Sequence, residues 1–239
     1  MFKFEGTEPE QIELSSILDT LQKTKTGQQM AAQLDCSLNG NPFILKFNKM
    51  MPDKGLCEFK QVSLNPLLLP TQNERIATLG HELAHATMWD ITKTAQHNAR
   101  TEDEYALVRL LMEAHGHMMS DLILQELNPC SATQDKAEGL PWWQMVDLAT
   151  KEGRTLYLKK ALEAETGWAE HELQQISHPM KFAHDADANL FEKSCATFLN
   201  VMNTNLTLDE ILRIKPYSKF KQYSSSRTVW KKLKHLFGR

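Results

Sequence analysis

The chain has 239 residues, of which 41% are hydrophobic, so it can bury the core of one domain of ordinary size. Residues 1–212 carry a net charge of −12 and residues 213–239 a net charge of +9, and so acidic a body argues against nucleic acid as the main partner. Four scattered cysteines, no signal-peptide core and no run of about 18 apolar residues exclude a disulfide framework, a classical secretory precursor and a membrane span.

The N-terminal part predicts a helix followed by strands. Apolar residues at helical spacing predict a helix within residues 9–34, and the runs 43–47 and 56–62 have strand composition on either side of a turn sequence at 52–55. We therefore expect a β-hairpin and an α+β fold that is mainly helical, with a small sheet beside the helices. An exposed edge strand can bind an extended peptide through main-chain hydrogen bonds, although a purely structural sheet fits the pattern equally well.

The next segment contains the most informative motif of the chain, His-Glu-x-x-His. Thr71–Glu74 has the sequence of a capping box, and apolar residues at helical spacing continue the predicted helix to about residue 91. His81 and His85 therefore project from one face of this helix and can bind a divalent metal ion, while Glu82 can act as the general base toward a water that the metal activates. A partly buried helix with two ordinary histidines is the alternative.

A second long helix, predicted over residues 101–127, supplies candidates for a third ligand. Glu113 lies among apolar residues on one face, where a carboxylate requires a compensating positive charge such as a metal ion. Arg109 and His117, one turn on either side, can orient or neutralise this carboxylate, and His117 is the alternative third ligand. An ordinary salt bridge to Arg109 would also explain Glu113. Gly116 would allow this helix to pack closely on the preceding one.

The sequence His81-Glu82-Leu83-Ala84-His85-Ala86, followed by Arg109–Gly116, resembles the zincin class of zinc metallopeptidases. It is similar to a group of uncharacterised bacterial metallopeptidase domains that carry His-Glu-Leu-x-His-Ala and later Arg-x-x-x-Glu-Ala-Asp-Ala, and the resemblance extends over residues 40–200. It implies a zincin-like core with a small sheet beside the motif helix, one Zn²⁺ ion per chain, and Glu113 as the third zinc ligand. His115-Gly116 stands where the group has Asp-Ala.

Residues 154–176 and 184–202 are also helical in pattern. A peptidase needs a hydrogen-bond donor opposite the oxyanion that develops on the carbonyl oxygen, and a tyrosine or a histidine can supply it. Tyr157, His178 and His184 are the candidates in this part of the chain. His184 would otherwise precede or cap the second of these helices.

A capping-box sequence at Thr207–Glu210 predicts a short helix before the basic arm. Within the arm, Ser224–Ser226 precedes a basic amphipathic segment at residues 229–237. Such a segment can contact an anionic membrane surface or a protein partner, and docking on the acidic body, a solvated tail and a secretion signal are the alternatives. We expect a single metallopeptidase domain over residues 1–212 and a separate arm over residues 213–239.

These patterns together predict a zinc-dependent metallopeptidase that hydrolyses peptide or protein substrates, with zinc held by His81, His85 and Glu113 and with Glu82 as the general base. There are two alternatives: zinc hydrolysis of a non-peptide amide, and a non-catalytic binding protein on a zincin-like scaffold. In the second alternative, the basic arm makes the functional contacts. The expected setting is the bacterial cytoplasm, with secretion as an effector as the alternative. No pattern predicts the substrate specificity or the oligomeric state.

Overall fold

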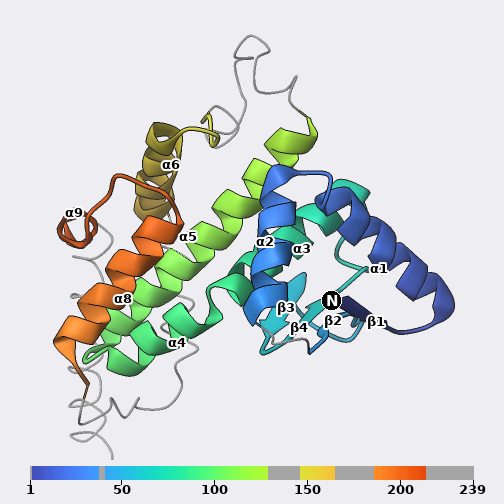
Figure 1. Cartoon of the computed structure of the whole chain (residues 1–239), viewed down its shortest axis with the longest axis horizontal. Coiled ribbons are helices and arrows are strands. Elements are labelled where there is room, and N and C mark those ends of the chain that lie inside the picture. Colours follow the sequence, from blue (N-terminus) through green and yellow to red (C-terminus); the bar gives the residue numbers. More distant parts are fainter. Residues whose placement is uncertain (1, 38–40, 129–145, 165–185, 214–239) are drawn as a thin grey trace, which may run out of the picture. The chain divides into compact units, whose positions relative to one another are not determined.

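The computed structural model describes residues 2–37, 41–128, 146–164 and 186–213. These residues form a mainly helical structure with a four-stranded sheet, which confirms the predicted α+β, mainly helical fold (Figure 1). In chain order the elements are β1 (Phe2–Glu5), α1 (Glu8–Leu21), α2 (Lys25–Ser37), β2 (Phe43–Phe47), β3 (Gly55–Glu58), β4 (Gln61–Leu64), α3 (Gln72–Thr87), α4 (Trp89–Asn98), α5 (Glu102–Leu127), α6 (Lys151–Ala164), α8 (Ala188–Val201) and α9 (Leu208–Leu212).

The chain divides into two compact units. The first is drawn from residues 1–89 and 115–154 and the second from residues 90–114 and 155–239, so the division falls within the continuous helix α5. The predicted extent of a single domain, residues 1–212, stays a prediction. None of the described helices is both long enough and apolar enough to cross a membrane.

The sheet belongs to the first unit and has the strand order β1-β2-β4-β3. β1, β2 and β4 run parallel, whereas β3 pairs antiparallel with β4 and is the last described strand at its edge. The predicted hairpin between runs 43–47 and 56–62 is therefore wrong. The second run itself reverses at Phe59-Lys60, where Lys60 has a φ of 64°, and the hairpin consists of β3 and β4.

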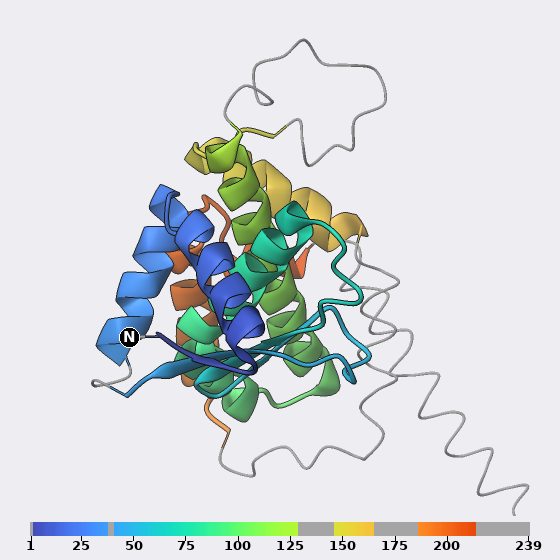
Figure 2. The ribbon, with the colours of Figure 1, turned by 90° about the vertical axis from the view of Figure 1, so that its right-hand side faces the viewer.

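The core of the first unit lies between the sheet and the helices packed on it. α1 and α3 contact the sheet and α2 contacts α3; Figure 2 shows α1, in dark blue, lying over the strands. Leu45 and Val62 of the sheet and Leu14, Leu79 and Leu83 of the helices are fully buried. Burial of these large apolar side chains is the main source of stability for the unit and holds α3 against the sheet.

The start of α3 confirms the predicted capping box. The amide of Glu74 donates to Thr71 Oγ1 at 3.3 Å, and the amide of Thr71 donates to Glu74 Oε2 at 3.0 Å. These bonds satisfy amides that a helix start otherwise leaves without a partner. The helix ends at Thr87, earlier than predicted, since the backbone leaves helical geometry at Met88 with φ −100° and ψ 6°.

Several other boundaries differ from the prediction. The predicted N-terminal helix is two helices, α1 and α2, because the chain turns at residues 22–24, where the hydroxyl of Thr24 donates to the Leu21 carbonyl at 2.7 Å. α6 begins at Lys151, and the predicted continuation of that helix beyond residue 164 lies outside the described residues.

The second unit has its own small core. Its buried cluster joins α4, α5 and α8 and comprises Ala95, Ala99, Val108, Phe191 and Cys195, with Tyr105 and Leu208 packed against it. α8 starts with an N-cap at Asp187, whose side chain accepts from the amide of Asn189 at 2.8 Å. The capping box predicted for α9 is confirmed.

Candidate metal centre

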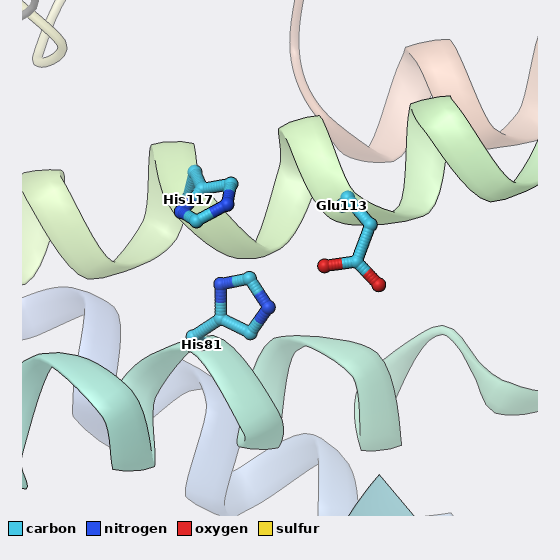
Figure 3. A group of neighbouring side chains, drawn as sticks. All are labelled: His81, Glu113 and His117. Atoms are coloured by element: carbon cyan, nitrogen blue, oxygen red, sulfur yellow. The ribbon is translucent and has the colours of Figure 1, made fainter. Parts of the chain in front are cut away.

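Helices α3 and α5 bring together three side chains that can ligate a metal. His81 comes from α3, and Glu113 and His117 come from α5, one helical turn apart, so that all three side chains gather between the two ribbons in Figure 3. One nitrogen or oxygen atom of each residue lies within 4.8 Å of those of the other two. His81 and Glu113 are half-buried and His117 is exposed, so the group is reachable from solvent on one side.

This group contains two of the three expected ligands. His81 and Glu113 are members, while His117, predicted as the alternative third ligand, takes part where the sequence predicts His85. His85 is buried next to it: the ring centroids of His81 and His85 lie 4.4 Å apart, and those of His81 and His117 lie 4.6 Å apart. Counting His81 itself, three imidazoles and one carboxylate therefore gather here.

The donor set fits zinc. Two imidazole nitrogens and one carboxylate oxygen are the composition of one well-known type of catalytic zinc site. Zinc–ligand bonds of about 2.0–2.2 Å place neighbouring donor atoms of a tetrahedral site roughly 3.4 Å apart. Donor atoms within 4.8 Å of one another therefore need side-chain adjustments of only about 1 Å to hold the ion.

Gly116 explains how two imidazoles reach the surface of α5. A Cβ built on Gly116 would lie 2.8 Å from Nδ1 and Cε1 of His81 and 2.9 Å from Cε1 of His85, distances that real Cβ contacts do not show. The missing side chain thus leaves room for both rings, and the expected close packing of the two helices at Gly116 is confirmed. On α3 itself, Gly80 has a similar role, because a Cβ there would lie 2.5 Å from Cδ1 of Ile123.

Replacing Gly116 by Ala should therefore weaken metal binding. The new methyl group must displace the rings of His81 and His85, and overpacking of this kind costs about 1–3 kcal/mol. We expect added zinc to raise the melting temperature of the wild type, and to raise that of this variant less. A full zinc-dependent rise in Gly116→Ala, measured by thermal unfolding with and without zinc, would show that the two rings do not depend on this glycine.

His115 is a buried residue of α5 close to His85 and His81. It is 3% exposed, and burial, reinforced by His85, His81 and Arg154, lowers the pKa of His115 to about 3. The imidazole is therefore neutral at pH 7 and adds no charge beside His81 and His85.

Glu82 lies on the side of α3 that faces the sheet. It is 7% exposed, and a Cβ built on Gly55 at the start of β3 would lie 2.5 Å from Glu82 Oε1 and 2.7 Å from Cγ2 of Thr78. The carboxylate is thus packed against the backbone of the edge strand. Sequence reasoning missed this contact, although a glycine at the start of a strand is a known signal of close backbone approach.

Cys57, also on β3, lies close enough to Glu82 to be affected by its charge. Burial, together with the negative charges of Glu82 and Glu58, raises the pKa of the Cys57 thiol well above its usual range. The thiol is therefore protonated at neutral pH, and a protonated thiol is a poor metal ligand and a poor nucleophile.

Of the other predicted site residues, the structure describes Arg109 and Tyr157. Arg109 is half-buried on α5, one turn before Glu113, and Tyr157 is 4% exposed on α6 in the second unit. His178 and His184 lie outside the described residues, as does the basic arm after Arg213. The oxyanion role of Tyr157, His178 or His184 therefore stays a prediction.

The chain was compared with protein-family models, with curated proteins and with solved structures, and it matches none of them.

Proposed function

We propose that this protein is a zinc-dependent metallopeptidase whose metal ion is held by His81, Glu113 and a second histidine. The observation that carries the proposal is the gathering of donor atoms of His81, Glu113 and His117 within 4.8 Å of one another. His81 belongs to the His-Glu-x-x-His sequence of α3, and the other two residues belong to α5. Two candidates compete for the second histidine: His85, by its spacing on α3, and His117, by its place in the group.

The residues of the site have different proposed roles. The histidines and Glu113 bind and orient the metal, and zinc at such a site supplies a Lewis acid that polarises a carbonyl and makes a water more acidic. Glu82 is adjacent to His81 in sequence but is not a member of the group, so we assign it the role of general base rather than of ligand. The 7% exposure of Glu82 keeps its carboxylate in a partly dry environment, where a proton acceptor is more effective.

The outer edge of β3, with which no other described strand pairs, favours a peptide as the substrate. The amide of Asn65 donates to the carbonyl of Lys54 at 2.9 Å, which marks 54 and 65 as a hydrogen-bonded pair of the ladder. In antiparallel strands, residue pairs that are joined by hydrogen bonds alternate with pairs that are not. Gly55 and Cys57 belong to the second kind, so they direct their N–H and C=O groups away from β4. An extended peptide can pair with these groups next to Glu82, and a small non-peptide amide would leave them unused.

Metal analysis of the purified full-length protein tests this proposal. We expect about one zinc ion per wild-type chain and a loss of zinc in His81→Ala and in Glu113→Ala. His97→Ala is the matched control, because His97 is an exposed histidine outside the group and its removal should change nothing.

His85→Ala and His117→Ala decide the second histidine. Loss of zinc in only one of them identifies the ligand, and partial loss in both indicates that the two share the ion. Zinc retained in both His81→Ala and Glu113→Ala, with folding verified by circular dichroism, would contradict the metal site. Zinc bound as expected, but no hydrolysis of unfolded protein substrates, would leave the alternative of a binding protein. The cytoplasmic setting and the role of the arm stay predictions.

A further inference from the structure

The edge strand β3 runs alongside α3 and leads from Glu82 to an aromatic pair. Gly55 at its start lies against Thr78 and Glu82, and just past its end the ring of Phe59 lies 5.9 Å from that of Trp89, at an interplanar angle of 43°. Four residues of strand span about 13 Å, and the five residues from Glu82 to the end of α3 at Thr87 span roughly 7.5 Å of helix, two residues short of Trp89. Strand and helix therefore point the same way, with the aromatic pair beyond Glu82.

The aromatic pair presents one ring to solvent. Phe59 is 60% exposed, whereas Trp89 is half-buried and supports it from behind. A single exposed apolar residue is ordinary, but this one is placed at the end of a row of open main-chain groups. A peptide that pairs with Gly55 and Cys57 also passes Phe59. When the peptide bond to be cleaved lies beside Glu82, the peptide residue next to Phe59 is three or four positions away from that bond.

A positive charge accompanies the ring. Lys60 Nζ lies 4.9 Å from the centroid of Phe59, a cation–π arrangement that the left-handed backbone of Lys60, with φ 64°, holds at the turn. The neighbouring Glu58 accepts a hydrogen bond at Oε2 from Gln61 Nε2, at 2.7 Å. The turn therefore offers a flat apolar surface next to a cation.

From this arrangement we propose that Phe59, Trp89 and Lys60 form a recognition site for a large apolar side chain followed by an acidic residue in an extended peptide bound along β3. The site would select substrates by residues three or four positions from the cleaved bond. Its role in substrate choice rests on the proposed peptidase function, but the binding itself requires neither metal nor Glu82. The apolar side chain packs on the ring of Phe59, and the acidic group pairs with Lys60.

Fluorescence anisotropy with full-length Glu82→Gln protein, which cannot turn over the probe under the proposed function, tests this site. The probes are short, fluorescently labelled peptides that consist of Ser and Thr residues except for one dipeptide. This dipeptide is Phe-Asp, Ala-Asp or Phe-Lys. We expect the Phe-Asp peptide to bind about tenfold more tightly than the Ala-Asp peptide, the gain that burial of a large apolar side chain allows. It should bind about two- to fivefold more tightly than the Phe-Lys peptide, and this second preference should fade with salt.

Three further variants in the Glu82→Gln background assign these preferences. Phe59→Ala should remove the preference for Phe, and Lys60→Asn should remove only the preference for Asp, because Asn tolerates the left-handed backbone at this position. Leu67→Ala is the control, since Leu67 is an equally exposed apolar residue, at 70%, outside this site. Both preferences should persist in it.

The outcomes separate this inference from the proposed function. Equal binding of the Phe-Asp and Ala-Asp peptides, no binding of any probe, or a preference that survives Phe59→Ala would overturn the recognition site. Wild-type protein that hydrolyses peptides without such a preference would leave the peptidase proposal standing and remove only this site. A Phe59-dependent preference in a protein without zinc or hydrolysis would keep the site and overturn the peptidase.

Discussion

Replacement of Glu82 by Gln should reduce peptide hydrolysis by about 10²- to 10⁴-fold, the usual contribution of a general base, while one zinc ion per chain stays bound. The amide has nearly the same shape as the carboxylate but cannot accept a proton from the attacking water. Because Glu82 packs against Gly55 and is not a member of the metal group, its replacement leaves His81, Glu113 and His117 in place. Hydrolysis rates and metal content, measured on the same samples, provide the two readouts.

Glu74→Gln is the matched control for this experiment. It is the same chemical change on the same helix, and the Gln side chain can still accept from the amide of Thr71 and preserve the capping box. We expect wild-type rates in this variant. If Glu82→Gln protein with full zinc content hydrolysed peptides at the wild-type rate, Glu82 would not be the base. If it lost zinc together with activity, Glu82 would act on the metal site instead.

The parts of the structure that the sequence predicts well are those determined by neighbouring residues. The start of α3 follows from the reciprocal bonds of Thr71 and Glu74, and the extent of α5 follows from apolar residues at helical spacing. The strands are harder to predict. β3 and β4 come from one short apolar run of the sequence, and their separation and pairing depend on the turn at Lys60 and on contacts with a distant strand, β2.

The same limit applies to the candidate site. Spacing along a helix indicates that His81 and His85 share a face of α3 and that Glu113 and His117 share a face of α5. It does not indicate which of these side chains meet, because that depends on the rotation of one helix against the other. The packing of Gly55 on Glu82 joins residues 27 positions apart, so no local pattern reveals it.

This contact supports a second strong prediction: Gly55→Ala should lower peptide hydrolysis by about 10- to 100-fold without loss of zinc. The added methyl group would meet Glu82 Oε1 at 2.5 Å and Cγ2 of Thr78 at 2.7 Å, so the buried carboxylate must move. Displacement of a catalytic group by about 1 Å can cost 10²-fold in rate. The backbone of Gly55 is not in the left-handed region, so the variant should still pair with β4.

Thr78→Ser tests whether the lower rate of Gly55→Ala comes from crowding of the new methyl group against α3. It removes the Cγ2 atom that the new methyl group would meet, so the double variant Gly55→Ala/Thr78→Ser should recover part of the lost rate, while Thr78→Ser alone should stay near the wild type. Gly116→Ala provides the opposite comparison, because its methyl group meets His81 and His85 and should reduce zinc affinity. Two glycine substitutions on either side of α3 would then affect the base and the metal separately. Zinc loss in Gly55→Ala, or an unchanged rate in it, would show that β3 does not position Glu82.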